Sequence, residues 1–293
     1  TYIDADVTKS PELADKLVSE ADVVVDLIAY ANPSIYVESP LEVVQLNFFE
    51  NLKITEMCMK HQKRLFQYST SEVYGKAGRT GFYSEDESDL VMGPTCKQRW
   101  IYASGKQYLE RIIHAHGMRG DLEYTIVRPF NFVGPRFDYL VEAGSLGGPR
   151  VFAHFMSALI TGGPINLLDG GEQRRSFTHI ADASDAFTVM LESPESVNEI
   201  YNIGNPATDT SIRDLAYYMM ELYEELTGKK AQNEIIEISG EDFYGVGYED
   251  MNRVPPDISK LGALGWEPVR GMRQTFADAM EYNLDPRVHA SIV

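Results

Sequence analysis

The chain of 293 residues has little cysteine, few basic residues and no long apolar run. Its two cysteines, Cys58 and Cys96, are too few for a disulfide framework and favour a reducing compartment such as the cytoplasm. Lys and Arg number 26 against 44 Asp and Glu, so the formal net charge is −18, whereas proteins that bind nucleic acid carry a basic face. No apolar stretch approaches the ~20 residues that span a membrane. We therefore expect no nucleic-acid or membrane partner, although a small phosphate-bearing ligand needs only one or two local cations.

The rest of the composition is typical of a folded globular protein, with 44% hydrophobic and 11% aromatic residues. At ~150 residues per domain, the length predicts one large domain or two coupled ones. Apolar, β-branched runs at residues 22–29, 64–70 and 124–128 are typical of buried strands.

Amphipathic stretches between these runs are predicted as helices. One begins at Pro40 with Leu41 on its apolar face, and one runs from about Trp100 until Gly117 ends it. A further helix is predicted at about 212–227. This alternation predicts an α/β fold with a doubly wound parallel sheet.

The pattern becomes less regular after residue 130, where glycine and proline interrupt residues 144–149 and 162–176. We predict one doubly wound domain from residues 1–130 together with about 177–203. Residues 131–176 and 204–293 would form a smaller C-terminal lobe over the carboxyl edge of the sheet, where such folds bind ligands.

Tyr102 and Lys106 are the strongest chemical signal, because a spacing of four places both side chains on one face of a helix. An ammonium group beside a phenol favours the phenolate and would lower the tyrosine pKa toward that of a general base. An ordinary amphipathic helix with a solvated lysine is the alternative, since the spacing is common.

Two further motifs lie at predicted strand ends, where an active site of this architecture belongs. The first, residues 69–75, brings hydroxyl groups and an acid, and the second, residues 128–136, brings amide and guanidinium donors. Each alone is equally typical of a turn or a capped loop. The three motifs together, in this order, favour an enzyme.

With these motifs the sequence resembles the extended short-chain dehydrogenase/reductases that act on nucleotide sugars, a Rossmann-like family. The resemblance covers essentially the whole chain, and its motifs are residues 69–75, Tyr102 with Lys106, 128–136, 170–177, 201–206 and 264–268. Within the family the chain looks most like the UDP-glucuronate decarboxylase branch. That branch includes the decarboxylase domain of the bacterial polymyxin-resistance enzyme and the plant UDP-apiose/UDP-xylose synthases. The distinguishing segments are residues 99–102, 147–150 and 243–250.

The resemblance implies NAD as cofactor and UDP-glucuronate as substrate. Tyr102 would take the proton of the sugar 4-hydroxyl while NAD⁺ accepts hydride from carbon 4. Lys106 would hold the nicotinamide ribose, and Thr70 would hydrogen-bond the reacting oxygen. A ketone at carbon 4 makes the substrate a β-keto acid, whose loss of CO2 leaves a resonance-stabilised enolate. The product would be UDP-4-keto-pentose or UDP-xylose.

Further roles follow from the same resemblance. Carboxylate handling and reprotonation at carbon 5 are implied for Ser71, Glu72 and Arg253. Substrate binding is implied for Tyr36, Asn131, Arg150, Arg175 and Tyr248, and cofactor binding for Asp6, at the adenine, and for Ala29. The six histidines show no metal-ligand spacing, so we expect no metal site. Relatives pair through helices that correspond to residues 41–60 and 100–116, which implies a homodimer.

The sequence departs from the family at several points. The glycine-rich phosphate loop is absent, and residues 4–7 resemble the segment after the third strand of the family. We therefore expect at least one βαβ unit to precede this chain, and this chain alone to bind NAD poorly. Asn166 stands where relatives often have a lysine near the nucleotide. Arg253 follows Tyr248 by five residues where relatives commonly have six, so a solvated loop arginine is the alternative for it. Apiose-forming relatives, whose reaction includes ring contraction, carry cysteine at the position of Ser71. The serine here therefore favours a pentose product without ring contraction.

Two other functions remain open from the sequence. The same oxidation by Tyr102 and Lys106 would serve a nucleotide-sugar 4-epimerase or 4,6-dehydratase. A non-catalytic nucleotide-binding protein on the same fold is the second alternative.

Overall fold

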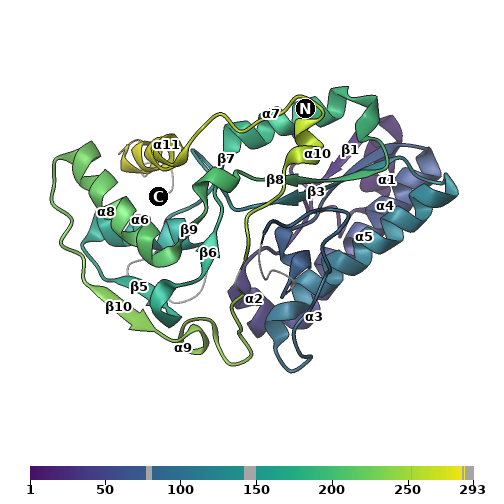
Figure 1. Cartoon of the computed structure of the whole chain (residues 1–293). Helices are drawn as coiled ribbons and strands as arrows, with labels where there is room; N and C mark the ends of the chain where they lie inside the picture. The colour runs from purple at the N-terminus through teal and green to yellow at the C-terminus, as the bar shows by residue number, and fades with distance from the viewer. Residues whose placement is uncertain (77–80, 142–149, 252, 286, 288–293) are drawn as a thin grey trace.

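The computed structural model describes residues 1–76, 81–141, 150–251, 253–285 and 287. Its centre is a parallel four-stranded sheet, as the strand–helix alternation predicts (Figure 1). The strands lie in the order β1 (Val23–Asp26), β2 (Arg64–Tyr68), β3 (Tyr124–Pro129) and β8 (Glu199–Ile203). The Rossmann-like α/β architecture is therefore confirmed.

Helices cover both faces of this sheet, because successive strand residues point to opposite sides. Leu65 and Ile126 pack with α1 (Pro11–Glu20), α4 (Asn51–His61) and α5 (Ile101–Arg119) on one face. Their neighbours Phe66 and Val127 pack with α7 (Ile180–Glu192) on the other. β2 and β3 are thus buried on both sides, which explains their continuous apolar runs. The prediction of a fully buried strand is wrong for β1, where Val25 is 40% exposed.

Short helical segments connect the strands of the main sheet. After β1 these are α2 (Pro33–Glu38), α3 (Pro40–Val44) and a π-helical segment, η1 (Gln45–Glu50), that runs directly into α4. After β2 they are the 3-10 segments η2 (Ser71–Tyr74) and η3 (Gln98–Trp100), the second leading into α5. The sequence predicted α5 to end at Gly117, but it continues to Arg119 and ends at Gly120, whose positive φ of 77° suits glycine.

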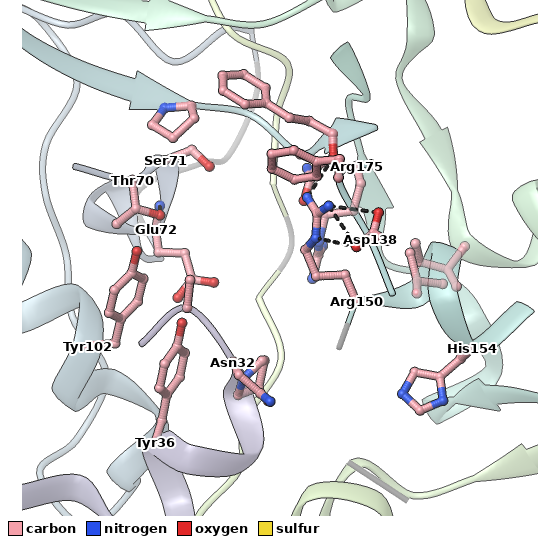
Figure 2. A pocket seen from close by; sticks show the side chains of 18 of the residues that line it. Asn32, Tyr36, Thr70, Ser71, Glu72, Tyr102, Asp138, Arg150, His154 and Arg175 are labelled. Atoms are coloured by element: carbon pink, nitrogen blue, oxygen red, sulfur yellow. Dashed lines mark hydrogen bonds and ion pairs between the residues drawn. The ribbon is translucent and has the colours of Figure 1, made fainter. Parts of the chain in front are cut away.

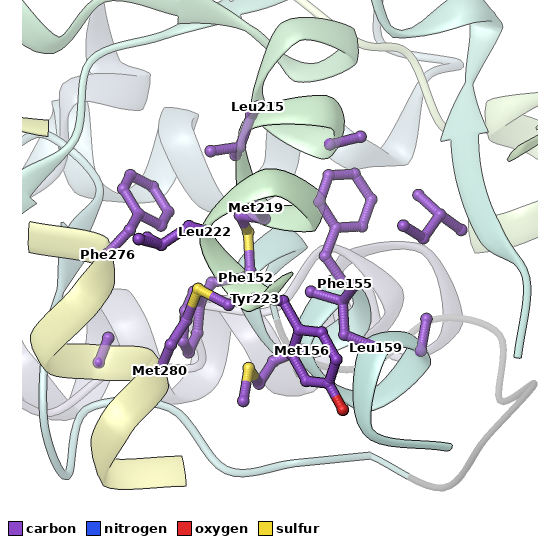
Figure 3. Close-up of a cluster of buried hydrophobic side chains, with 14 of the residues drawn as sticks. Phe152, Phe155, Met156, Leu159, Leu215, Met219, Leu222, Tyr223, Phe276 and Met280 are labelled. Atoms are coloured by element: carbon purple, nitrogen blue, oxygen red, sulfur yellow. The ribbon is translucent and has the colours of Figure 1, made fainter. Parts of the chain in front are cut away.

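The C-terminal lobe has its own core, formed where three helices meet (Figure 3). These helices are α6 (Val151–Thr161), α8 (Ile212–Thr227) and α11 (Met272–Leu284). Ser211 caps α8 by accepting a hydrogen bond from the backbone N–H of Asp214 at 3.0 Å, and Gly228 ends it, so α8 has the bounds that the sequence predicts.

Short paired strands complete the lobe and its connection to the sheet. They are β5 (Ile165–Leu168) with β10 (Ile235–Ile238), β6 (Arg174–Arg175) with β9 (Thr210–Ser211), and β4 (Phe132–Val133) with β7 (Thr178–His179). Beyond β10 lie α9 (Gly240–Tyr244) and α10 (Ser259–Gly262). Leu261 and Trp266, assigned by the sequence to the lobe, instead pack with Phe66 and Val127 of the main sheet. The domain boundaries otherwise stay a prediction.

Candidate active site

A cavity of about 1030 Å³ lies at the carboxyl edge of the main sheet and is lined by residues of both the sheet domain and the C-terminal lobe (Figure 2). The segments that follow β1, β2 and β3 contribute to the lining, as do α6 and the segment around Tyr248. It contains most residues that the sequence analysis selected: Ala29, Tyr36, Thr70, Ser71, Glu72, Tyr102, Asn131, Arg150, Arg175, Tyr248 and Arg253.

Tyr102 projects into this cavity from the first turn of α5. The ring of Tyr36 stacks on it with centroids 4.7 Å apart and planes at 13°, which fixes the orientation of the phenol. Thr70, the N-cap of η2, lies beside Tyr102 in the cavity, and its hydroxyl acts to lower the pKa of Tyr102. Burial, reinforced by the negative charge of Glu72, raises the pKa of Tyr102, so the lowered pKa expected from the sequence is not found in this structure.

Lys106 lies one turn further along α5 and is fully buried, outside the residues that line the cavity. Its ammonium group donates to the side-chain oxygen of Asn51 at 2.8 Å and to the carbonyl of Tyr68 at 3.0 Å. Burial lowers the pKa of Lys106 to about 8, although the carboxylates of Asp26 and Glu110 oppose the change.

Glu72 lies between two buried guanidinium groups. Its Oε2 accepts from Arg99 Nη1 at 2.7 Å, and its Oε1 accepts from Arg253 Nη2 at 3.0 Å. Burial opposes ionisation of this carboxyl, but the two arginines outweigh it and hold the pKa of Glu72 below its usual range.

Arg253 also donates to the Ser71 hydroxyl at 3.1 Å, so it reaches the site in spite of its shifted spacing in the sequence. Its side chain is 8% exposed, which excludes the alternative of a solvated loop arginine. Burial and the neighbouring Arg175 lower the pKa of Arg253 to about 10.

The other two cavity arginines are each fixed by a carboxylate. Arg175 pairs with Asp250 at 2.6 Å. Arg150 makes a two-oxygen contact with Asp138 at 2.8 Å and donates to the Phe132 carbonyl at 2.7 Å. Both guanidinium groups are therefore held in defined orientations, as recognition of phosphate or carboxylate requires.

Asn131 is held nearby, donating from Nδ2 to the Ser176 carbonyl at 3.0 Å. The segment at residues 147–150, singled out in the sequence, is described only at Arg150, and residues 144–149 lie outside the described part of the chain.

Ionised residues that line the described part of the cavity comprise four arginines and three carboxylates, which leaves a surplus of one positive charge. The arginines are Arg99, Arg150, Arg175 and Arg253, and the carboxylates are Glu72, Asp138 and Asp250. Roles for Arg99, Asp138 and Asp250 were not predicted from the sequence. Arg99 and Asp250 belong to segments that distinguish the decarboxylase branch, whereas Asp138 had no sequence signal.

Asp6, like Lys106, is a selected residue that does not line the cavity. Its carboxylate accepts from the backbone N–H and the hydroxyl of Thr8 at 3.0 and 2.7 Å and pairs with Lys9. Hydrogen bonds from Thr8 and Lys9 lower the pKa of Asp6 to about 2. The adenine contact stays a prediction.

Among the residues that the structure describes, no three His, Cys, Asp or Glu side chains gather as metal ligands would. No helix within the same residues has the length and apolar character needed to cross a membrane.

The fold and this cavity agree with a sequence comparison, in which residues 1–204 match the NAD dependent epimerase/dehydratase family. The chain belongs to this family of NAD-dependent enzymes, whose members include enzymes of nucleotide sugars.

The sequence is also similar to individual proteins of known activity or structure. The UDP-D-apiose/UDP-D-xylose synthase of Oryza sativa subsp. japonica is 38% identical over 94% of this chain and 74% of its own length. Synthase 1 of Arabidopsis thaliana is also 38% identical, over 91% and 73%. The crystal structure of the PbgP3 protein from Burkholderia pseudomallei superposes with a TM-score of 0.84 at 34% identity, covering 98% of this chain and 83% of that one.

Proposed function

We propose that the protein is an NAD-dependent nucleotide-sugar decarboxylase that converts UDP-glucuronate to UDP-4-keto-pentose or UDP-xylose with release of CO2. The observation that carries this proposal is the Arg253 guanidinium, buried beside Ser71 and Glu72. Its Nε has no hydrogen-bond partner among the described residues. A buried donor without an acceptor destabilises the folded protein. The carboxylate of a bound sugar would supply an acceptor of opposite charge.

The similarity to UDP-apiose/UDP-xylose synthases supports a nucleotide sugar as substrate. Arg150 and Arg175 line the cavity with planar guanidinium groups that suit the pyrophosphate, and Asn131 and Tyr248 would bind the remainder of the nucleotide sugar. UDP-glucuronate carries its negative charge on the pyrophosphate and on the sugar carboxylate, and a surplus of positive charge in the cavity favours such an anionic ligand.

The carboxyl ends of β1 and β2 fit the cofactor that the family uses. Ala29 and Ala31 present small side chains to the cavity, and the buried Oγ of Ser69 in its wall has no partner among the described residues. Ala29, Tyr102 and Lys106 would hold NAD there. When bound, NAD⁺ supplies the two-electron acceptor for carbon 4 and a positively charged ring.

Tyr102 is the proton acceptor for the 4-hydroxyl in this proposal, and Thr70 shares the hydrogen bond. The stacked ring of Tyr36 keeps the phenol from rotating. Nearby cations favour the phenolate, and Arg253 and Arg99 already oppose the rise in the pKa of Tyr102. Arg253 and Ser71 hold the carboxylate until CO2 leaves, and Ser71 and Glu72 line the path for the proton that returns to carbon 5.

The proposal is tested by incubating the full-length protein with NAD⁺ and UDP-glucuronate and weighing the sugar nucleotide by mass spectrometry. We expect a product lighter by one CO2 and a fall in rate of about 10²–10⁴-fold in Tyr102→Phe. Tyr217→Phe, at an exposed position of α8 outside the cavity lining, is the matched control and should retain the rate. Unchanged sugar mass without CO2 would contradict decarboxylation and leave an epimerase, and no turnover of any kind would favour a binding protein.

A cytoplasmic homodimer is part of the same proposal. Leu41, Phe49 and Tyr108 expose large apolar side chains on α3, η1 and α5, the helices expected to pair. Sedimentation of the full-length protein at micromolar concentration tests this, and a monomer there would contradict it.

A further inference from the structure

The ammonium group of Lys106 rests on a buried amide whose role the proposed reaction does not explain. This amide belongs to Asn51, the first residue of α4, which is 0% exposed. It lies directly after the π-helical segment η1. Segments of π-helix are rare and frequently occur at functional sites.

The orientation of the Asn51 amide is fixed by its partners. Its Nδ2 faces the carbonyl oxygens of Ile28 and Leu46 at 3.1 and 3.2 Å, which can only accept hydrogen bonds. Its Oδ1 therefore faces Lys106 Nζ at 2.8 Å, and also Gln67 Nε2 at 3.4 Å. Asn51 thus links the end of β1, the π-helical segment and the lysine.

A second buried amide in η1 provides a comparison. Asn47 accepts from the backbone N–H of Tyr30 at 2.7 Å and donates to its carbonyl at 2.9 Å, so it too holds the chain after β1. The Asn47 side chain hydrogen-bonds the backbone of Tyr30, whereas the Asn51 side chain also accepts from Lys106. Comparison of Asn47 with Asn51 therefore separates support of the chain after β1 from support of Lys106.

Charge around Lys106 is sparse, so each polar partner matters. Asp26 on β1 and Glu110 on α5 are the carboxylates that act on it. Asp26 pairs in register with Gln67, so a buried polar row runs from Asp26 through Gln67 and Asn51 to Lys106. Burial raises the pKa of Asp26. The side-chain oxygen of Asn51, at 2.8 Å, is a neutral acceptor in direct contact with the ammonium group.

We propose that Asn51 is a positioning residue for Lys106, whose side-chain oxygen keeps the ammonium charged and directed to the carboxyl end of β2. The inference rests on the proposed function in one respect, namely that Lys106 acts beside Tyr102 in the reaction.

The experiment follows the Lys106 side chain itself in the full-length protein. The ¹³Cε resonance of Lys106, assigned by its loss in Lys106→Met, is titrated with pH in the absence of substrate. Removal of an acceptor from a charged donor in Asn51→Leu should lower the midpoint by about one pH unit, a tenfold loss of proton affinity. Asn51→Asp places a carboxylate at the same position and should raise the midpoint.

Asn47→Leu is the matched control, because it removes a buried amide from the same segment without touching Lys106. We expect its midpoint to equal that of the wild type, with unfolding midpoints reported for all variants. If Asn51→Leu does not fold, Asn51→Asp decides. An unchanged Lys106 midpoint in a folded Asn51 variant, or an equal change in Asn47→Leu, would overturn the proposal.

Turnover gives an additional readout. In Asn51→Leu the pH dependence of kcat should move with the Lys106 midpoint, and in Asn51→Asp it should move the opposite way. The titration needs no substrate, so it is independent of which reaction the enzyme performs. A shifted midpoint with no decarboxylation would overturn the proposed function and leave the role of Asn51 intact.

Discussion

Substitution of Glu72 by glutamine tests whether its carboxylate holds the buried arginines of the cavity together. Glu72 neutralises Arg99 and Arg253, whose side chains are 2% and 8% exposed, at N–O distances of 2.7 and 3.0 Å. Removing one partner of a buried ion pair leaves an uncompensated charge and costs about 3–5 kcal/mol. Because Glu72→Gln leaves two guanidinium groups without their anion, we expect a loss of about 3–5 kcal/mol in the free energy of unfolding at pH 7.

The stabilisation by Glu72 should depend on pH in a defined direction. The pKa of Glu72 is lowered in the folded protein, so its contribution is complete above the ordinary value of 4.5 and is lost as the pH falls through the folded value. The difference in stability between wild type and Glu72→Gln should therefore be constant near neutral pH and shrink progressively below pH 4.5.

Urea unfolding followed by circular dichroism measures this, because urea does not screen charges. Glu172→Gln is the matched control, since Glu172 is 79% exposed in its pair with Arg213 and should contribute at most about 0.5 kcal/mol. Equal losses for the two substitutions, or a Glu72→Gln loss that persists in acid, would refute the reasoning.

Two further substitutions test packing and a buried charge. Gly117→Ala places a Cβ 2.3 Å from a ring carbon of Tyr124, so we expect a loss of about 1–3 kcal/mol by urea unfolding, and wild-type stability would contradict this close approach. Asp182→Ala removes the buried acceptor of the Arg270 backbone N–H and guanidinium, at 3.1 and 2.5 Å, and should cost about 1.5–3 kcal/mol. The neighbouring Asp185→Ala, 64% exposed and 3.4 Å from the same guanidinium, should cost far less, and an equal effect would count against a specific role for Asp182.

Elements with a regular pattern of apolar residues could be predicted from the sequence, and an element that departs from such a pattern could not. The buried strands and α8 follow simple patterns of apolar and capping residues, so their positions could be read directly. The prediction of a helix from Pro40 assumed a constant number of residues per turn, which placed Leu41 on the apolar face. The π-helical segment η1 has a different number of residues per turn, and Leu41 is 79% exposed. Sequence spacing alone could not show this change of phase.

The site could be predicted at strand ends but not in its ion pairs. Parallel strands bring their carboxyl ends to one edge, so Thr70, Ser71 and Glu72 could be placed together from the sequence. The partner of Glu72, by contrast, lies 181 residues away at Arg253. Nothing local in a sequence records a pair at that separation. The family resemblance supplied Arg253 but gave no role to Arg99, which completes the cluster.

The carboxylates of the cavity explain how a chain with a net charge of −18 can present a cationic site. Without anions, Arg99, Arg175 and Arg253 would repel one another in a buried space, and Arg175 already contributes to the lowered pKa of Arg253. Glu72 and Asp250 remove most of that repulsion and fix the guanidinium planes through short contacts. One positive charge is left over within the lining. A substrate carboxylate would therefore complete an arrangement of charges that the protein has already oriented.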